Sequence, residues 1–373
     1  MKAVAVTPSR REVGLVEHEE PQIVSPTDVK LRVLDVGVCA TDREICAFVL
    51  GTPPPGCDYL IVGHEALAEV VAVGQGVSAV TVGDLVVPMV RRPCPHEHCI
   101  ACRHQRSDLC FTGDFTERGI KLAHGYMTAF AVDDDNYLHR VPAELRDVAV
   151  LVEPLTIAEK AFAQAWQLQE RLPWVPPRVP GEQPAYRQAA VVLGAGPVGL
   201  LGAAALVARG LDTYVYSREP ASDPRARFAD AIGATYVCSE TDSVQRLAQR
   251  MRRIDLVYEA LGAADIAFDV MRALGPNGVY IVTGVPRLHR IAQFDTESII
   301  SNLVLKNQVI YGSVNAGAEA YAAAIRDLSL FMHHWPDAIR SLITALHPID
   351  AYRDLLLGRP DGIKNVIALE FGD

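Results

Sequence analysis

The sequence lacks an excess of positive charge. Among its 373 residues, 35 are Lys or Arg and 45 are Asp or Glu, which gives a formal net charge of −10. Proteins that bind nucleic acid or anionic membranes use basic surfaces to neutralise phosphate charge. The net negative charge argues against nucleic-acid binding and against membrane binding as the main activity. Arg103, His104 and Arg106 are therefore expected on a solvated face rather than in a nucleic-acid-binding zinc ribbon.

The sequence also lacks an unbroken apolar run of membrane-spanning length. Residues 189–208 carry no charge, but Gly and Pro interrupt the middle of the stretch. A β-branched run gives way there to an Ala- and Leu-rich one, which predicts a buried strand, a tight turn and a buried helix. Residues 1–6 read as a strand without the apolar core or cleavage site of a signal peptide, so we expect a cytoplasmic protein.

Internal repeats and low-complexity segments are absent too, and half of the residues are hydrophobic, which argues against long disorder. The length allows two domains with cores of their own. Short β runs such as 29–33, 66–73 and 85–89, broken by Gly, Pro and Asp, predict a largely β first domain of barrel type. A helix is expected over 155–171, followed by a Pro-rich linker over 172–188.

After the linker, strands and helices alternate, which predicts a doubly wound parallel sheet and an α/β plus β fold class. We expect strands at 190–193, 213–216, 235–238, 256–259 and 279–283, with helices at 198–209 and 224–232. The expected organisation is a first domain at 1–156 and a second at 157–316. The remaining segment, 317–373, is expected to hold a helix to about 333 and a strand near 366–370, and to pack back on the first domain.

Cysteine is not scarce, and one of the eight cysteines begins a mixed set of donor groups. Cys39 is followed 25 residues later by His64 and Glu65. A thiolate, an imidazole and a carboxylate suit zinc better than other biological metals. Thr41 and Asp42 add a hydroxyl and a second carboxylate beside Cys39, which indicates catalysis rather than a purely structural site. The alternative is a buried free cysteine and an unrelated surface Gly-His-Glu.

Four further cysteines lie close together, in a C-x4-C-x2-C-x7-C run. In a cytosolic protein such a cluster more often holds metal than forms disulfides. It predicts a closed tetrahedral zinc lobe over 94–110. His96 could replace the first thiol as a ligand, and redox-active cysteines are the other alternative. The preferred ligands are Cys94, Cys99, Cys102 and Cys110.

A glycine-rich turn lies between a predicted strand and a predicted helix. It matches G-x-G-x-x-G, in which the first Gly permits the turn, the second lets backbone approach a pyrophosphate, and the third allows close helix packing. The helix N-terminus faces the anion. The sequence therefore predicts a dinucleotide site, formed by Gly194, Ala195, Gly196, Pro197, Val198 and Gly199.

The end of the next strand bears on the choice of cofactor. An acid there would hold the 2′-hydroxyl of NAD, but Ser217 and Arg218 stand at this position. A hydroxyl and a guanidinium suit the 2′-phosphate of NADP. Glu219, one position later, keeps NAD possible, so the prediction is NADP or NAD with NADP preferred.

Taken together, these motifs resemble the zinc-dependent medium-chain alcohol dehydrogenases, and within them the glucose dehydrogenase group. The similarity spans nearly the whole chain. The motifs that carry it are Cys39-Ala40-Thr41-Asp42, Gly63-His64-Glu65, the cysteine lobe, the glycine-rich turn, Gly312-Ser313-Val314-Asn315, Glu117-Arg118-Gly119-Ile120 and Glu153-Pro154-Leu155-Thr156.

The resemblance implies a GroES-like catalytic domain and a Rossmann domain, with the active site in the cleft between them. It implies a catalytic zinc on Cys39 and His64, with Glu65 and Glu153 completing or exchanging in its shell. Because adjacent strand residues point oppositely, His64 and Glu65 can both ligate only from a turn or through water. Asp42 would fix the imidazole ring. The resemblance also implies sugar contacts by Thr41, Glu117, Glu153 and Asn315. It implies nicotinamide contacts by Thr283, Gly284, Val285, Ser313, Val314 and Asn315.

The reaction that the resemblance implies is the oxidation of an aldose, first of all of D-glucose at its C1 hydroxyl to gluconolactone, with Thr41 relaying the proton. Several buried polar groups favour a polyhydroxylated substrate over a plain alcohol. A polyol, pentose or cyclitol dehydrogenase is the alternative. A structural zinc protein without turnover is the rival from another class, and the intact phosphate-binding turn argues against it. A homodimer or homotetramer is usual in the family.

Overall fold

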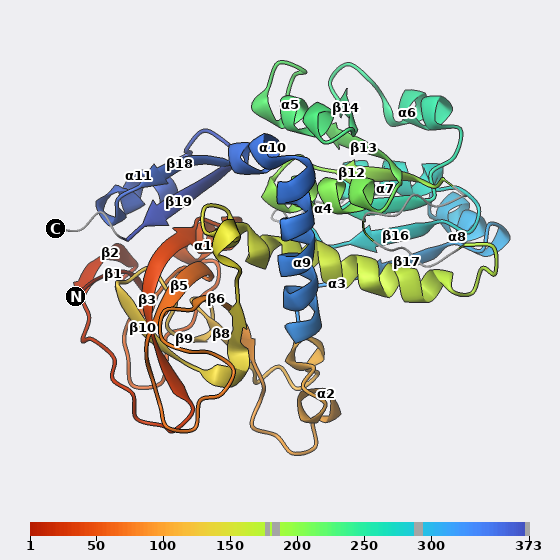
Figure 1. The fold of residues 1–373 in the computed structure, drawn as a ribbon. Helices are drawn as coiled ribbons and strands as arrows, with labels where there is room; N and C mark the ends of the chain where they lie inside the picture. The colour runs from red at the N-terminus through yellow and green to blue at the C-terminus, as the bar shows by residue number, and fades with distance from the viewer. Residues whose placement is uncertain (176–179, 181–186, 287–293, 370–373) are drawn as a thin grey trace. The chain divides into compact units, whose positions relative to one another are not determined.

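The computed structural model describes residues 1–175, 180, 187–286 and 294–369. The chain divides into two compact units (Figure 1). Unit 1 comprises Met1–Thr156, Asn315–Leu328 and Ile343–Asp373, and unit 2 comprises Ile157–Val314 and Ser329–Leu342. Among the described residues, no helix is long and apolar enough to cross a bilayer.

Unit 1 is largely β, as the broken β runs predict. Its main sheet has the order β11-β6-β5-β3-β19-β18, with β10 also paired to β3, and two three-stranded sheets, β2-β1-β4 and β7-β8-β9, complete it. The strands are β1 Lys2–Thr7, β2 Glu12–Glu17, β3 Asp28–Gly37, β4 Leu60–Ile61, β5 Glu65–Val73, β6 Leu85–Pro88, β7 Arg91–Arg92, β8 Thr116–Arg118, β9 Leu122–Ala123, β10 Phe130–Asp134, β11 Leu138–Arg140, β18 Ile343–His347 and β19 Lys364–Ala368.

The central strand β3 shows how this unit creates a buried site. Its first half alternates buried Val29 and Leu31 with less buried residues, which is typical of a sheet with one solvated face. From Val33 to Gly37 every residue is buried, so both faces are covered at that end. The short helices of the unit are α1 Ala40–Cys46, α2 Ile100–Arg103 and α11 Tyr352–Leu356, with 3₁₀ turns η1 Ser107–Leu109, η2 Asp135–Tyr137, η3 Ala143–Leu145, η4 Ala149–Leu151 and η5 Ile349–Ala351.

Unit 2 contains the predicted parallel sheet, in the order β14-β13-β12-β15-β16-β17. Helices cover both faces: α4 packs on β12, β13 and β15, while α6 and α7 share a core with the opposite side of β12. The elements of unit 2 are β12 Ala189–Leu193, α4 Pro197–Ala208, β13 Asp212–Ser217, α5 Pro224–Ala231, β14 Thr235–Cys238, α6 Val244–Met251, β15 Leu256–Glu259, α7 Ala264–Ala273, β16 Val279–Val282, α8 Thr296–Leu305, β17 Val309–Gly312 and α10 Pro336–Ser341. Two helices begin in unit 1 and end in unit 2, namely α3 Val152–Gln169 and α9 Ala318–His334.

Some predicted elements differ from those observed. Helix α3 begins at Val152, before the predicted start, because Glu153 suits the first helical turn and Pro154 is tolerated there. The edge strand β17 was not predicted. Residues 329–342 group with unit 2, where α10 packs on α5, rather than with the rest of the C-terminal segment. Most of the predicted linker 172–188, and the last residue of the strand predicted near 366–370, lie outside the described residues.

Candidate functional site

Cys39, His64 and Glu65 come together in unit 1, with their ligand atoms all within 4.8 Å of one another. Cys39 immediately precedes α1, and the other two residues stand where the chain enters β5. His64 and Glu65 are almost fully buried, at 4% and 1% exposure. The predicted mixed donor set is therefore a single buried cluster in the structure.

Two glycines allow adjacent residues to face the same cluster. Gly63 has φ +90°, a left-handed turn that favours glycine, so His64 approaches from a turn and only Glu65 belongs to the strand. Gly37 lies directly across from Glu65 in the ladder between β3 and β5. A Cβ added to Gly37 would lie 2.3 Å from Glu65 Oε2, so the missing side chain makes room for the carboxylate.

Asp42 fixes the orientation of the imidazole. Its carboxylate is fully buried and accepts from Cys39 N at 2.8 Å, Gly63 N at 3.2 Å and His64 Nδ1 at 3.2 Å. Burial alone would raise the pKa of Asp42, but His64 and the backbone donors hold this pKa below its ordinary value. An ionised carboxylate only accepts, so the proton sits on Nδ1 and Nε2 is left as the ligand atom.

Lys364 is a charged neighbour that the sequence interpretation missed. Its ammonium, in β19, is 2% exposed, donates to Glu65 Oε2 and also donates to Val38 O at 3.2 Å. Burial alone would lower the pKa of Lys364, but Glu65 and Cys39 raise it above the ordinary lysine value. The cluster thus holds a buried cation that offsets part of its negative charge.

Glu153 and Thr41 were also predicted to act here. Burial raises the pKa of Glu153 to about 7, His64 opposes this rise and Glu65 adds to it, so the carboxyl senses the charges of the cluster. Its oxygens are not within the 4.8 Å group, and its role as a ligand stays a prediction. Thr41 lies in the first turn of α1, and its hydroxyl makes no hydrogen bond with the described residues, which leaves it available for a substrate.

The cluster fits zinc. Sulfur, nitrogen and oxygen donors with bond lengths of about 2.0–2.3 Å in a tetrahedron lie about 3–4 Å from one another, which is compatible with the observed spread. The pair with Lys364 occupies one oxygen of Glu65, and a carboxylate has a second. Three protein donors also leave a fourth position open, the arrangement of a catalytic zinc.

The four thiols of the predicted lobe form a second cluster, again within 4.8 Å. The chain folds there into the short helix α2 and the turn η1, with Cys94 and Cys99 buried. His96, the alternative first ligand, instead contacts Asp114 through Nε2 at 2.5 Å. This geometry favours Cys94, and four sulfur donors without an open position could hold a structural zinc.

The glycine-rich turn of unit 2 has the geometry of an anion site. Gly194 follows β12 with φ +100°, and Gly196 precedes α4, whose first residue is Pro197. A Cβ on Gly199 would lie 2.1 Å from Gly194 O, so only glycine allows this close packing of helix on turn. Ala195 N donates to Ser217 Oγ at 3.3 Å, which joins the turn to the end of β13.

The residues predicted to choose the cofactor differ in how they are engaged. Ser217 Oγ donates to Glu219 Oε2 at 2.5 Å, so one oxygen of this carboxylate is already engaged. Arg218 is exposed, and its guanidinium has no hydrogen bond or ion pair with the described part of the chain. A free guanidinium at this edge could receive a 2′-phosphate.

The other predicted cofactor residues also follow the carboxyl ends of parallel strands, where ligands of doubly wound sheets bind. Thr283, Gly284 and Val285 come after β16, and Ser313 and Val314 after β17. Two buried residues that the sequence interpretation missed hold these segments. Glu259 accepts from Leu261 N, Gly262 N and Gly284 N at 2.6–3.1 Å, and Lys160 Nζ donates to Val314 O at 2.8 Å.

Glu117 and Asn315, predicted to contact a sugar, meet in unit 1. Asn315 Nδ2 donates to Glu117 Oε1 at 2.9 Å, although the residues are 198 positions apart. Arg91, which the sequence interpretation missed, pairs with the same oxygen at 2.9 Å. The structure thus brings together two predicted residues and adds a third.

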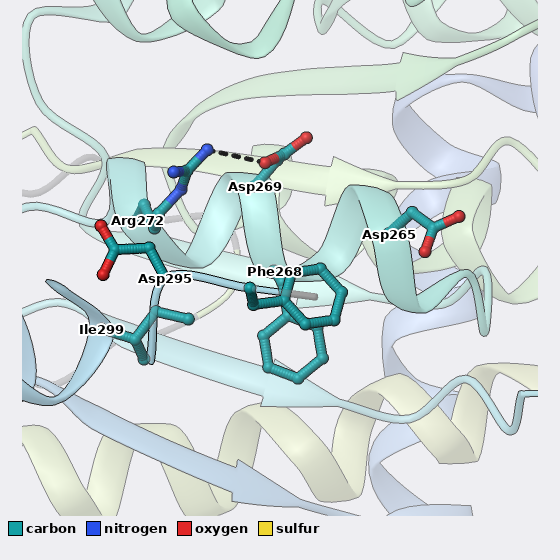
Figure 2. Close-up of a pocket in the computed structure, with 7 residues that line it drawn as sticks. Asp265, Phe268, Asp269, Arg272, Asp295 and Ile299 are labelled. Carbon is teal, nitrogen blue, oxygen red and sulfur yellow. Dashed lines mark hydrogen bonds and ion pairs between the residues drawn. The ribbon is translucent and has the colours of Figure 1, made fainter. Parts of the chain in front are cut away.

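A separate hollow of about 310 Å³ lies on unit 2, lined by residues of α7 and the start of α8 (Figure 2). Its carboxylates already have structural tasks. Asp269 pairs with Arg272 at 2.8 Å, and Asp295 caps α8 by accepting from Ser298 N at 3.0 Å. None of the predicted site residues lines it, so it is not the candidate active site.

Comparison with known families agrees with this arrangement. Residues 25–143 match the alcohol dehydrogenase GroES-like domain, and residues 146–369 match the glucose dehydrogenase C-terminus. The second match covers more than half of the chain. The predicted combination of a GroES-like domain with a Rossmann-type parallel sheet is therefore confirmed.

Individual relatives align over nearly their whole length. Glucose 1-dehydrogenase of Methanocella arvoryzae is 34% identical and that of Thermoproteus tenax 37%, each alignment covering 99% of this chain and at least 99% of the relative. The solved Haloferax mediterranei glucose dehydrogenase in complex with NADP, Zn and gluconolactone is 32% identical, covers 99% of both chains and has a TM-score of 0.86. Galactitol-1-phosphate dehydrogenase of Escherichia coli, at 19% identity and a TM-score of 0.78, shares the fold.

Proposed function

Because this chain belongs to the glucose dehydrogenase family of zinc-dependent medium-chain dehydrogenases, we propose that it oxidises D-glucose at the C1 hydroxyl to gluconolactone with NADP as hydride acceptor. The single observation that carries this proposal is the buried Cys39, His64 and Glu65 cluster, oriented by Asp42, in a chain that also has a complete dinucleotide turn. A structural zinc protein would need no such turn.

Each group of the cluster has a task that follows from its environment. Zinc bound there would lower the pKa of a coordinated hydroxyl, and NADP bound at the turn would accept the hydride. Asp42 keeps the imidazole in one tautomer, and Lys364 limits the build-up of negative charge. Thr41 Oγ makes no hydrogen bond with the described residues. We assign to it the transfer of the substrate proton toward solvent.

The preference for NADP rests on the second strand of the parallel sheet. The guanidinium of Arg218 has no partner among the described residues and is free to pair with a 2′-phosphate, whereas Glu219 already holds Ser217 through one of its two oxygens. We expect Arg218→Ala to raise the KM for NADP about tenfold or more and to leave the KM for NAD within about twofold, because only NADP carries the phosphate. Glu219→Gln is the matched control, since the amide can still accept from Ser217.

The test of the proposed function is a coupled absorbance screen of aldoses, pentoses, polyols and cyclitols with each nicotinamide cofactor. The expected result is fastest reduction of NADP by D-glucose. Fast turnover of a polyol or cyclitol without glucose activity would replace the substrate and keep the chemistry. Turnover of ethanol with no sugar oxidised, or no dinucleotide binding at all, would reject the proposal.

We propose in addition that the chain forms a homodimer or homotetramer in the cytoplasm. Strand β17 ends the parallel sheet, and the neighbouring helix α8 exposes Ile300, Val304 and Leu305 at 61–80%. An edge strand beside an apolar surface favours pairing with a second copy. A reducing compartment suits a lobe of free thiols. Light scattering of Val304→Lys, which should shift the mass toward the monomer, tests the interface.

A further inference from the structure

Arg91 contacts Glu117, one of the predicted sugar contacts, and two further partners. It lies in the two-residue strand β7 and its side chain is 9% exposed. Both Nε, at 3.0 Å, and Nη2, at 2.9 Å, reach Glu117 Oε1. Nη1 donates to Asp108 O at 3.3 Å, and the guanidinium lies 3.7 Å from the centre of the Phe115 ring. Four contacts to three partners leave Arg91 little freedom to move.

The contacts of Arg91 determine which atom of Glu117 is free. Oε1 receives both Arg91 donors and Asn315 Nδ2 at 2.9 Å. Oε2 has no hydrogen bond among the residues that the structure describes, although the side chain is 12% exposed. The carboxylate is thus anchored through one oxygen and presents the other as an acceptor.

Asn315 is fixed in the same way. Its backbone is left-handed, with φ 60°, which asparagine tolerates better than most residues. Its Oδ1 accepts from Ala316 N at 2.8 Å, and its Nδ2 donates to Glu117, so both ends of the amide have a matching partner. An amide nitrogen has two hydrogens, and the second remains available. An acceptor and a donor therefore stand side by side.

We propose that Arg91 is a positioning residue that fixes Glu117 and Asn315 as an acceptor and donor pair for one substrate hydroxyl. This inference rests on the proposed function and deepens it. The hydroxyl donates to Glu117 Oε2 and accepts from Asn315 Nδ2. A group that can do only one of these leaves a buried polar atom unpaired, and this is the discrimination that hydroxyl-binding sites achieve.

The turn η1 of the cysteine lobe is part of this support. Asp108 supplies the carbonyl that Arg91 Nη1 reaches, and its carboxylate is held by Arg106 Nε and Nη2, both at 2.9 Å. Asp108 stands two residues before Cys110, a member of the four-thiol cluster. The lobe therefore holds the guanidinium of Arg91 through Nη1, while its other two nitrogens hold Glu117. A change in the lobe is thus expected to alter the binding of the sugar.

The experiment measures kcat and KM for D-glucose and for glucoses with fluorine in place of one hydroxyl, at C2, C3, C4 or C6. Fluorine accepts a hydrogen bond but cannot donate to Glu117. In the wild type, one analogue should show a KM about 30-fold or more above glucose. Arg91→Lys keeps the charge but loses the fork, so KM for glucose should rise about 10- to 100-fold with kcat within about threefold, and the penalty on that one analogue should shrink.

Arg92→Lys is the matched control. Arg92 is the neighbouring arginine of β7, but it pairs with Asp133 at 2.7 Å and donates to Met89 O at 2.7 Å, away from Glu117. It should lower the melting temperature and leave both KM and the fluorine penalties unchanged. Asn315→Asp provides a second route if Arg91→Lys does not fold, because aspartate also tolerates the left-handed backbone but cannot donate. Fluorine would then lose the donor of Asn315 and face two acceptors, so the penalty at the same carbon should grow, whereas the hydroxyl of glucose can still donate. An unchanged penalty would contradict the pairing of Glu117 and Asn315 on one hydroxyl.

The outcomes separate the two proposals. A wild type that oxidises glucose, together with an Arg91→Lys enzyme of unchanged KM, overturns the role of Arg91 and leaves the proposed function intact. A KM that rises equally for all analogues, with the fluorine penalty preserved, also overturns it, since that result indicates a merely structural role. A wild type that oxidises no aldose removes both proposals.

Discussion

The two cysteine-containing clusters of unit 1 differ in what surrounds them. Cys39, His64 and Glu65 combine three kinds of donor, and buried charged groups, Asp42 and Lys364, fix or balance them. The lobe has four identical sulfur donors on a short helix and turns, with no His, Asp or Glu among its ligand atoms in the described structure. Different donors with charged neighbours leave room for a reacting group, whereas four thiols fill a tetrahedron.

Loss of a thiol should therefore have different effects at the two clusters, and the largest is expected at the mixed one. Cys39→Ala should lower kcat/KM by at least about 10³, because the metal supplies several kcal/mol of charge stabilisation. Zinc content should fall by about one ion per chain, with little change in melting temperature. Steady-state kinetics and metal analysis give both values.

Cys46→Ala is the matched control, since Cys46 is a buried cysteine at the end of α1, the helix that Cys39 precedes, and lies outside the cluster. It should cost about 1 kcal/mol of stability and keep both activity and zinc. Equal loss of activity in the two variants would contradict the assignment of Cys39.

At the lobe, Cys99→Ser should mainly affect stability. We expect a decrease of at least about 2 kcal/mol in the free energy of unfolding and the loss of about one zinc ion, because a closed structural site contributes folding energy. kcat should stay within about threefold, while KM for the sugar rises through Asp108 and Arg91. Denaturant unfolding and kinetics measure these effects. A collapse of kcat without loss of stability would reverse the proposed roles of the two clusters.

Lys364→Met tests the buried charge beside the mixed cluster. Removing the ammonium leaves Glu65 buried without its ion-pair partner, which costs about 3 kcal/mol when nothing replaces it. Zinc on the cluster would offset part of that cost. The difference in melting temperature between variant and wild type should therefore be larger after chelation than with zinc bound. An equal difference in both states would show that Glu65 and the metal do not interact.

His139 allows acid effects to be separated from metal loss. Burial, aided by Arg92, lowers the pKa of His139 to about 4, and its ring stacks on Tyr321 at 4.9 Å. The imidazole of His139 takes up a proton near pH 6.5 in the unfolded chain, but only near pH 4 in the folded chain. The stability that the neutral ring provides is therefore complete above pH 6.5 and is lost as pH falls toward 4, by about 1–3 kcal/mol.

His139→Phe keeps an aromatic ring against Tyr321 and removes the titration. Its unfolding free energy should fall less than that of the wild type between pH 6.5 and 4, at constant zinc. Identical pH profiles would assign the acid loss to other groups, including the metal ligands themselves.

Much of the fold follows from local sequence patterns. The turn from Gly194 to Gly199, the parallel strands around it and the β runs of unit 1 were predicted with boundaries close to those observed, because each depends on residues near in sequence. The four thiols of the lobe lie within 17 residues, so their meeting was predictable as well.

The residues that support the site were not predictable from local patterns. Lys364 meets Glu65 across 299 positions, and a lysine at the start of an apolar strand gives no sign of its partner. In the sequence Arg91 has no feature that distinguishes it from other basic residues. Its role is visible only from its contacts with β8 and η1 in the structure. The division of 317–373 between units depends on which surfaces α9 and α10 bury. These three features depend on long-range packing, which local sequence patterns do not reveal.

The most direct test of the account is zinc titration of the chelator-treated wild type, with NADPH formation from D-glucose as the readout. The account predicts no turnover without metal and a linear return of activity as the Cys39, His64 and Glu65 cluster fills. In Cys39→Ala, zinc should still bind to the lobe and restore no activity. Full turnover by the metal-free chain, or recovery in Cys39→Ala equal to that of the wild type, would contradict it.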